Sequence, residues 1–358
     1  MDRTDDMPTP EPGSTPPAAM APQESVAEHL ARAGVSRRDF LKLCGLLAGS
    51  LAVFGSPVGD TLTALLGDDA AGAEALAAAL ATAAWTPIIW HEFQGCTACT
   101  ESMLRAKTNT ALDLLLGRVW LDYHETLMAA AGAQAEAARR QTMQDYAGRY
   151  LLVVDGAVPT KNGGVTCTIA GQSAVALLKE AAAGAAAVVA LGNCASFGGL
   201  PAARPNPTGA VAVSTLLPGK KVVNVPGCPA LPEVITGTLA YFLVHGAAPP
   251  LDGHKRPTAY YEETVHDECP REDAYDEERF VRALDDAGAK KGYCLFELGC
   301  KGPITRSACP TMKWKAGPSF PIASGHPCMG CTEPGFWDRY SIYQRGPEDD
   351  DEGGGGDD

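Results

Sequence analysis

Positive charge is in short supply in this sequence of 358 residues. Its 29 lysines and arginines face 43 aspartates and glutamates, which gives a formal net charge of -14 at pH 7. Such a chain repels phosphate backbones and anionic membrane surfaces, so nucleic-acid binding has no electrostatic basis. We expect proteins or small molecules as partners, and no nucleic acid.

Apolar runs long enough to cross a membrane are also lacking. Residues 43–54 are apolar, but a spanning helix needs about 20 such residues. No apolar run follows the last cysteines, so we expect no C-terminal membrane anchor in this chain. The short run has the length of a signal-peptide core, and the pair Arg37-Arg38 precedes it. This arrangement resembles a twin-arginine export signal.

The alanine-rich stretch after this run is typical of the approach to a cleavage site. Ala71-Gly72-Ala73 and Ala81-Thr82-Ala83 are two possible sites, so the mature protein is expected to begin between about residue 74 and residue 85. We interpret residues 1–84 as a disordered leader with a twin-arginine signal peptide. The mature protein is then exported to the periplasm or the outer face of the cell membrane.

Cysteine, by contrast, is abundant. Twelve cysteines in such a chain indicate either a disulfide framework or metal ligation. Disulfide-rich secreted domains are small and lack a large core, whereas 46% of this chain is hydrophobic, which is enough to bury one. Several cysteines also form short-range pairs, and this spacing favours metal.

After the leader, short apolar runs alternate with helical stretches. Strands are predicted at 87–90, 150–154, 186–191 and 221–225, and helices at 171–183 and 231–245. The alternation favours an open parallel α/β sheet in a domain spanning residues 85–252. Cysteine-bearing loops follow three of these four strands, at the sheet edge where such folds gather their chemistry.

Beyond residue 252 the sequence becomes polar and rich in glycine and proline, yet six of the twelve cysteines lie there. An irregular domain at 253–340, held together by metal clusters, is the simplest interpretation. Residues 341–358 are acidic and glycine-rich and predict a disordered tail.

The first cysteine set follows the strands of the sheet and consists of Cys96, Cys99, Cys194 and Cys228. Two thiolates in a C-x-x-C pair can bind neighbouring irons of one cluster, which then needs two more ligands. A lone C-x-x-C is a weak signal, because redox dithiols and zinc sites share it. Four strand-end cysteines that can converge at one sheet edge are a strong signal.

Two further sets lie in the second domain. One consists of His266, Cys269, Cys294 and Cys300, and the other of Cys309, Cys328 and Cys331. One histidine with three cysteines can bind zinc as well as an iron-sulfur cluster, and spacing alone does not decide between them. The last set offers three thiolates without an obvious fourth, which suits a three-iron cluster.

Together these residues resemble the small subunit of nickel-iron hydrogenases over roughly residues 85–338. The likeness extends beyond the cysteines to four segments, at 155–159, 203–208, 266–269 and 325–334. It implies a flavodoxin-like first domain with a parallel sheet, followed by an irregular iron-sulfur cluster domain.

The resemblance also implies two 4Fe-4S clusters and one 3Fe-4S cluster. The proximal 4Fe-4S cluster would lie on Cys96, Cys99, Cys194 and Cys228, the distal 4Fe-4S cluster on His266, Cys269, Cys294 and Cys300, and the medial 3Fe-4S cluster on Cys309, Cys328 and Cys331. Pro321 stands where a fourth medial cysteine would be. Cys44 and Cys167 remain, and we interpret Cys167 as a buried apolar residue.

By the same resemblance the chain is the electron-transfer subunit of an uptake hydrogenase, an oxidoreductase acting on H2. It would relay electrons between the nickel-iron site of a large subunit and an acceptor such as a cytochrome or a membrane anchor protein. No catalytic residue is expected here, because no second cysteine set remains to hold nickel. The alternatives are a multicluster electron carrier of another exported oxidoreductase and a zinc-stabilised interaction protein.

A few other residues near these sets carry weaker expectations. Glu101 could orient the first ligand loop, and Arg204 could be a buried loop anchor, whereas His91 and His326 are expected to make ordinary hydrogen bonds. Oxygen-tolerant members of the family carry two extra cysteines beside the proximal cluster. The matching positions are Ala98 and Gly199, so the resemblance implies an ordinary proximal cubane with one redox step.

Overall fold

The computed structural model describes residues 86–106, 119–314, 317–339 and 343–344. The predicted signal peptide and its cleavage sites lie outside these residues, as does the tail predicted at 341–358 except for residues 343–344. The boundaries predicted for the domains remain predictions.

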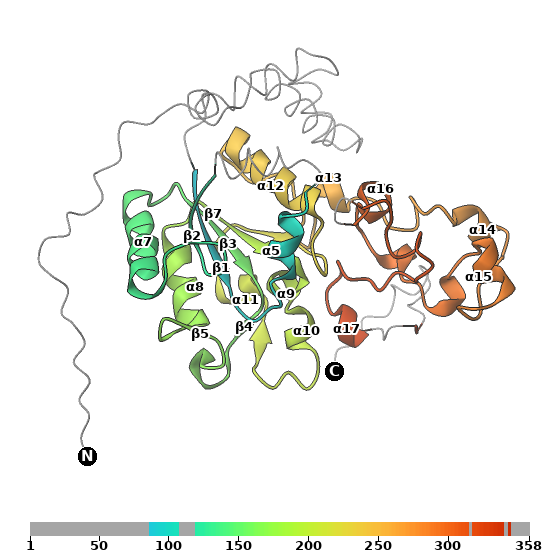
Figure 1. Ribbon diagram of the computed structural model, residues 1–358, viewed down its shortest axis with the longest axis horizontal. Coiled ribbons are helices and arrows are strands. Elements are labelled where there is room, and N and C mark those ends of the chain that lie inside the picture. The colour runs from blue at the N-terminus through green and yellow to red at the C-terminus, as the bar shows by residue number, and fades with distance from the viewer. Residues whose placement is uncertain (1–85, 107–118, 315–316, 340–342, 345–358) are drawn as a thin grey trace, which may run out of the picture.

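A five-stranded parallel sheet forms the first part of the molecule (Figure 1). Its strands are β1 (Thr86–Glu92), β2 (Val119–His124), β3 (Leu151–Asp155), β7 (Ala187–Leu191) and β9 (Val222–Val225). Their spatial order is β2-β1-β3-β7-β9, which is the 2-1-3-4-5 order of flavodoxin-like sheets when the sheet strands alone are counted. The predicted fold class is confirmed.

The inner strands form because their sequences are short, continuous apolar runs. All five residues of β3 and of β7 are buried, as are all four of β9, as expected for parallel strands covered on both faces. Successive side chains alternate between two cores. Ile88 packs in one core with Val234 of α12 (Pro232–His245), and Ile89 in the other with Leu177 of α8 (Ala174–Ala183).

Helices cover both faces of the sheet (Figure 1). Those in the first part are α5 (Ala98–Met103), α7 (Gly132–Asp145), α8 (Ala174–Ala183), α9 (Gly192–Phe197), α10 (Gly199–Ala202), α11 (Val213–Leu216) and α12 (Pro232–His245). A 3-10 turn spans Lys161–Gly164, and two small antiparallel pairs join β4 (Val158–Pro159) to β8 (Ala210–Val211) and β5 (Thr168–Ile169) to β6 (Gln172–Ser173). The predicted helices at 171–183 and 231–245 therefore correspond to α8 and α12.

The second part of the chain lies beside the sheet and has little regular structure (Figure 1). It contains α13 (Thr258–Tyr261), α14 (Glu272–Asp276), α15 (Ala287–Lys291), α16 (Cys309–Met312), α17 (Phe336–Arg339) and 3-10 turns at Phe296–Leu298 and Gly302–Ile304. Its buried residues, among them Val265 and Phe320, belong to the same core as Ile88. One continuous core therefore joins the two parts.

Candidate functional site

Strand register brings the first cysteine set to one edge of the sheet. Glu92, Asp155, Leu191 and Val225 are aligned across β1, β3, β7 and β9, and each is the last residue of its strand. The chain then needs only a few residues beyond β1, β7 and β9 to reach a cysteine. The loops that carry Cys96, Cys99, Cys194 and Cys228 therefore begin side by side at the carboxyl edge of the sheet, as predicted.

Electrostatic contacts link the four thiols of this set, with Cys96 in reach of Cys194 and Cys228. Burial raises the pKa of Cys99, and so does the proximity of Asp155, Cys194 and Cys228. Burial, followed by the charge of a Cys228 thiolate, likewise raises the pKa of Cys194 to about 12. A bare thiolate quartet is thus unfavourable, and such a quartet suits a cationic metal centre that compensates the charge.

Two glycines let the backbone approach these sulfurs. A Cβ built at Gly192 would collide with the Sγ of Cys99, and one at Gly199 would lie 2.8 Å from the backbone nitrogen of Cys194. Both glycines also have positive φ, +77° and +51°, which favours glycine. Position 192 therefore favours glycine beside the Cys99 sulfur, and position 199 favours glycine beside Cys194.

A buried polar network beneath this set was not expected from the sequence. The Thr100 hydroxyl donates to the Glu92 carboxylate at 2.8 Å and lies 3.4 Å from Nε2 of His124. Burial and the charge of Glu92 raise the pKa of Asp155 to about 7. The sequence signals were the position of Asp155 directly after the predicted strand at 150–154 and its place in the segment 155–159. The network fixes α5, which carries Cys99 in its first turn.

The second set surrounds a single hollow. Its lining includes His266, Cys269, Cys294 and Cys300, all four of the predicted residues. Tyr275 packs against the His266 ring at 4.6 Å between centroids. Burial raises the pKa of Cys294 to about 11, with further contributions from Cys300 and Cys269.

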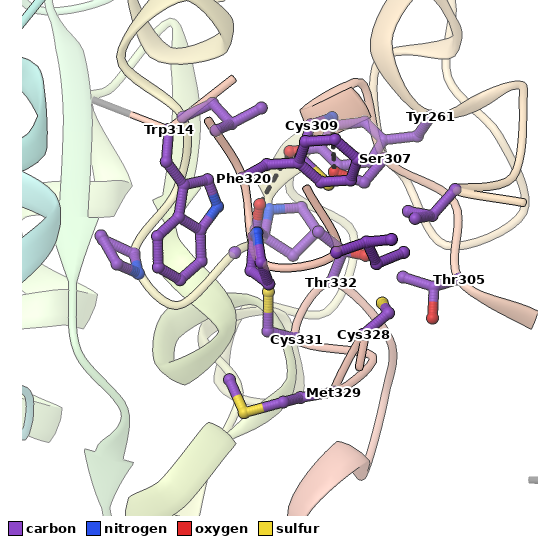
Figure 2. Close-up of a pocket in the computed structure, with 17 residues that line it drawn as sticks. Tyr261, Thr305, Ser307, Cys309, Trp314, Phe320, Cys328, Met329, Cys331 and Thr332 are labelled. Atoms are coloured by element: carbon purple, nitrogen blue, oxygen red, sulfur yellow. Dashed lines mark hydrogen bonds between the residues drawn. The ribbon is translucent and has the colours of Figure 1, made fainter. Parts of the chain in front are cut away.

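The third set lines another hollow, between the sheet and the second part of the chain. Figure 2 shows Cys309, Cys328 and Cys331 around it, with Phe320 and Trp314 on the same lining. Pro321 is also part of this lining. Burial raises the pKa of both Cys309 and Cys331 to about 12. The three cysteines thus line one hollow, and Pro321 lines it with them, where a fourth cysteine ligand would be expected.

Hydrogen bonds connect each set to the next. The Cys331 thiol lies within electrostatic reach of Cys228, and the Cys328 backbone N–H donates to the Sγ of Cys300 at 3.3 Å. In addition, the Asn193 side-chain amide donates to the carbonyl oxygens of Cys331 and Glu333, both at 3.0 Å. The third set therefore lies between the first and the second.

The weaker sequence expectations have mixed outcomes. His91 bonds to Glu125 through Nδ1 at 2.8 Å, and His326 bonds to the Pro327 carbonyl and the Tyr343 hydroxyl, each at 2.9 Å. Glu101 of α5 forms an ion pair with Arg105, which lies just beyond the end of that helix.

The expectation for Arg204 was wrong, because its side chain is exposed. The anchor at this position is instead its backbone N–H, which donates to the Asp338 carboxylate at 3.1 Å. Cys167 is only half-buried and packs against the core that contains Leu177.

Within the ranges described above, no three or more His, Cys, Asp or Glu side chains are close enough together to hold a single metal ion. In the same ranges, no helix has both the length and the apolar character that a membrane span requires.

Sequence families match both parts of the chain. Residues 261–344 match the family described as the C-terminal part of the NiFe/NiFeSe hydrogenase small subunit. Residues 96–242 match the family of the 20 kDa subunit of NADH ubiquinone oxidoreductase.

The chain is 43% identical over 326 residues to the uptake hydrogenase small subunit of Azotobacter vinelandii, covering 91% of this chain and 87% of that protein. It is 42% identical over 323 residues to the hydrogenase-1 small chain of Escherichia coli, covering 90% and 83%.

Solved structures agree with these matches. A [NiFeSe]-hydrogenase chain of Desulfomicrobium baculatum superposes with a TM-score of 0.68 at 32% identity, covering 73% of this chain and all of that one. The actinobacterial-type NiFe-hydrogenase of Ralstonia eutropha gives a TM-score of 0.67 at 29% identity, covering 74% and 83%. The sequence and the fold of this chain are thus similar to those of the compared proteins over most of the length of each.

Proposed function

Because this chain belongs to the family of nickel-iron hydrogenase small subunits, the electron-transfer subunits of a heterodimer, we propose that it carries three iron-sulfur clusters. The family as a whole implies iron-sulfur clusters and a large-subunit partner. The number of clusters, their types and their ligands are our proposal.

The proposal rests on one observation, the sorting of ten cysteines and one histidine into three compact groups. Cys96, Cys99, Cys194 and Cys228 would hold a proximal 4Fe-4S cluster. His266, Cys269, Cys294 and Cys300 would hold a distal 4Fe-4S cluster, and Cys309, Cys328 and Cys331 a medial 3Fe-4S cluster. Thiolates with at most one imidazole are the usual donors for such clusters, and buried thiols of raised pKa need a cationic centre to become thiolates.

When bound, these clusters supply one-electron transfer, and the protein's own residues set the conditions for it. The backbone N–H of Cys328 donates to the Cys300 sulfur of the neighbouring set. The Asn193 side chain, next to Cys194, donates to the Cys331 carbonyl, so hydrogen bonds link each proposed site to the next. His266 contributes a neutral imidazole where the other ligands are anionic thiolates. Because it lowers the negative charge of its site, it favours a higher reduction potential there.

We further propose that the electrons pass between the nickel-iron site of a large subunit and an external acceptor, such as a cytochrome or a membrane anchor protein. Export by the twin-arginine route, to the periplasm or the outer face of the cell membrane, is proposed from Arg37 and Arg38 and the apolar run that follows them. These residues lie outside the described ranges.

Metal analysis of the purified heterodimer tests the cluster assignment. Two four-iron clusters and one three-iron cluster give roughly eleven irons in the small subunit, to be counted beyond the iron of the large subunit, with a matching amount of acid-labile sulfide. A Cys167→Ser variant is the control, because that thiol lies outside all three sets and its loss should leave the iron content unchanged. Roughly four irons, or stoichiometric zinc, would overturn the proposal and favour the zinc-stabilised alternative.

A further inference from the structure

One lysine side chain lies inside the protein between two of the cysteine sets. Lys301 directly follows Cys300 and is only 2% exposed, which is rare for lysine. Its aliphatic stem packs against Gly330, where an added Cβ would lie 3.4 Å from the Cδ of Lys301. Since Gly330 separates Cys328 from Cys331, this side chain extends from a residue of the distal set across the medial loop.

Hydrogen bonds hold Lys301 in this position. Its ammonium group donates to the carbonyl oxygens of Gly299 at 3.3 Å and Gln344 at 3.2 Å. Its backbone N–H donates to the carbonyl oxygen of Cys328 at 2.9 Å. An ammonium group has three N–H donors and no acceptor, so carbonyl oxygens are suitable partners for it. The side chain is therefore fixed at both ends and is kept away from solvent.

The charge of Lys301 interacts with both neighbouring sets. Burial lowers the pKa of Lys301, and the thiolates of Cys328 and Cys300 raise it. Conversely, Lys301 helps to lower the pKa of Cys300. In the protein interior such interactions are screened far less than at the surface. The lysine thus stabilises negative charge at the medial and distal sites together.

We propose that the Lys301 ammonium raises the reduction potentials of the medial and distal clusters together, and leaves that of the proximal cluster unchanged. This inference rests on the proposed function. Reduction of a cluster adds one electron and no proton, so it adds one negative charge, which a fixed positive charge nearby favours. Lys301 is not a cluster ligand, and it would act on the two clusters through its charge.

Redox titration of the purified heterodimer, followed by electron paramagnetic resonance, tests the proposal. In Lys301→Met, the medial and distal clusters should become harder to reduce by at least tenfold, which is a downward shift of about 59 mV for a one-electron step. Lys301→Arg keeps the charge and should stay close to the wild type. The proximal cluster is the control within the molecule, and Lys290→Met, which removes an exposed positive charge, is the matched control variant.

The outcomes separate this inference from the proposed function. A wild-type complex without the three cluster signals overturns the function itself. A wild type with all three signals, but with unchanged medial and distal potentials in Lys301→Met, overturns only the role of Lys301. If Lys301→Met fails to load its clusters, Lys301→Gln decides, because its amide still donates hydrogen bonds but carries no charge. If Lys301→Met and Lys301→Gln both lose iron while Lys301→Arg loads normally, the result also counts against the proposal. The positive charge would then be needed for cluster assembly and not for setting the potentials.

Discussion

The backbone N–H of Cys328 points at the sulfur of Cys300, with 3.3 Å between nitrogen and Sγ. These two cysteines belong to different ligand sets and are both buried. Hydrogen bonds to the ligand sulfurs are one of the factors that set cluster potentials. On the proposed ligand assignment, the medial loop would adjust the distal site through its backbone, and a change in the position of Cys328 would affect both sites.

Asn193 should be the side chain that keeps the medial loop in place against the first part of the protein. Asn193→Ala removes the bonds to the carbonyls of Cys331 and Glu333 and leaves both oxygens without that donor, at a cost of about 1–3 kcal/mol. We expect a changed line shape of the oxidised three-iron signal and a lower temperature at which the visible cluster absorbance is lost.

Asn224→Ala is the matched control for this prediction. Asn224 is also buried and donates one side-chain bond, to the His254 carbonyl at 2.8 Å, but this bond involves no cysteine loop. The substitution should lower the free energy of unfolding by about 1 kcal/mol and leave the three-iron signal unchanged. Equal spectral changes in both variants would show that the link from Asn193 to Cys331 has no special role.

Cys309→Ser should abolish the signal of the oxidised three-iron cluster and spare the signals of the reducible four-iron clusters. Cys309 lines the same hollow as Cys328 and Cys331, and a three-iron cluster keeps no spare ligand. Electron paramagnetic resonance measures the three-iron signal in the oxidised heterodimer and the four-iron signals in the reduced heterodimer. Retention of the three-iron signal would contradict the assignment of Cys309.

Pro321→Cys should convert the three-iron cluster to a four-iron form, because Pro321 belongs to the lining of this hollow and a cysteine there offers a fourth thiolate. The oxidised three-iron signal should disappear and the iron content should rise by about one atom. Pro318→Cys, on the same segment but absent from the lining, should leave the signal intact. An unchanged spectrum in Pro321→Cys would count against the medial site.

The proximal cluster should show one redox step. Ala98 and Gly199 supply no thiolate, and a Cβ at Gly199 would lie 2.8 Å from the nitrogen and Cα of Cys194 and 2.9 Å from its Sγ. A cysteine cannot enter there without displacing the ligand loop, since the backbone also has a φ of +51°. Potentiometric titration of the heterodimer measures the number of redox transitions of the proximal cluster. Two closely spaced transitions would contradict the prediction.

Replacing Arg37 and Arg38 together with lysine should hold the precursor in the cytoplasm. A protein that has received its clusters is folded, and the twin-arginine route carries folded cargo. Immunoblots of the periplasmic, membrane and cytoplasmic fractions measure the distribution, and Arg32→Lys, which lies outside the pair, is the control. Normal export of the double variant would refute the signal assignment.

Much of the fold follows from local sequence pattern, and the exceptions have a physical cause. The buried strands β3, β7 and β9 are apolar nearly throughout and were predicted to within one residue at either end. The edge strand β2 was missed, because it contains Asp122 and His124. The helix α7 was missed as well, since its buried face carries Glu136 and Arg139, which pair with each other, so hydrophobic periodicity is weak there.

The candidate ligands could be predicted because clustered cysteines mark metal sites, and strand ends converge in a parallel sheet. The residues that surround the ligands could not. Asp155, Asn193 and Lys301 are ordinary polar residues in the sequence, and each acquires its role only from burial beside a cysteine loop. Lys301 in particular is a surface residue by every statistical expectation.

The continuous core has a consequence for maturation. Cys300, Cys309 and Cys328 are members of the same apolar cluster as Ile88 and the sheet, so the future ligands are interior groups from the start. Ionising them without a metal would place uncompensated charge in that interior, and metal binding is therefore coupled to packing. A protein without its clusters is therefore expected to have a less stable core.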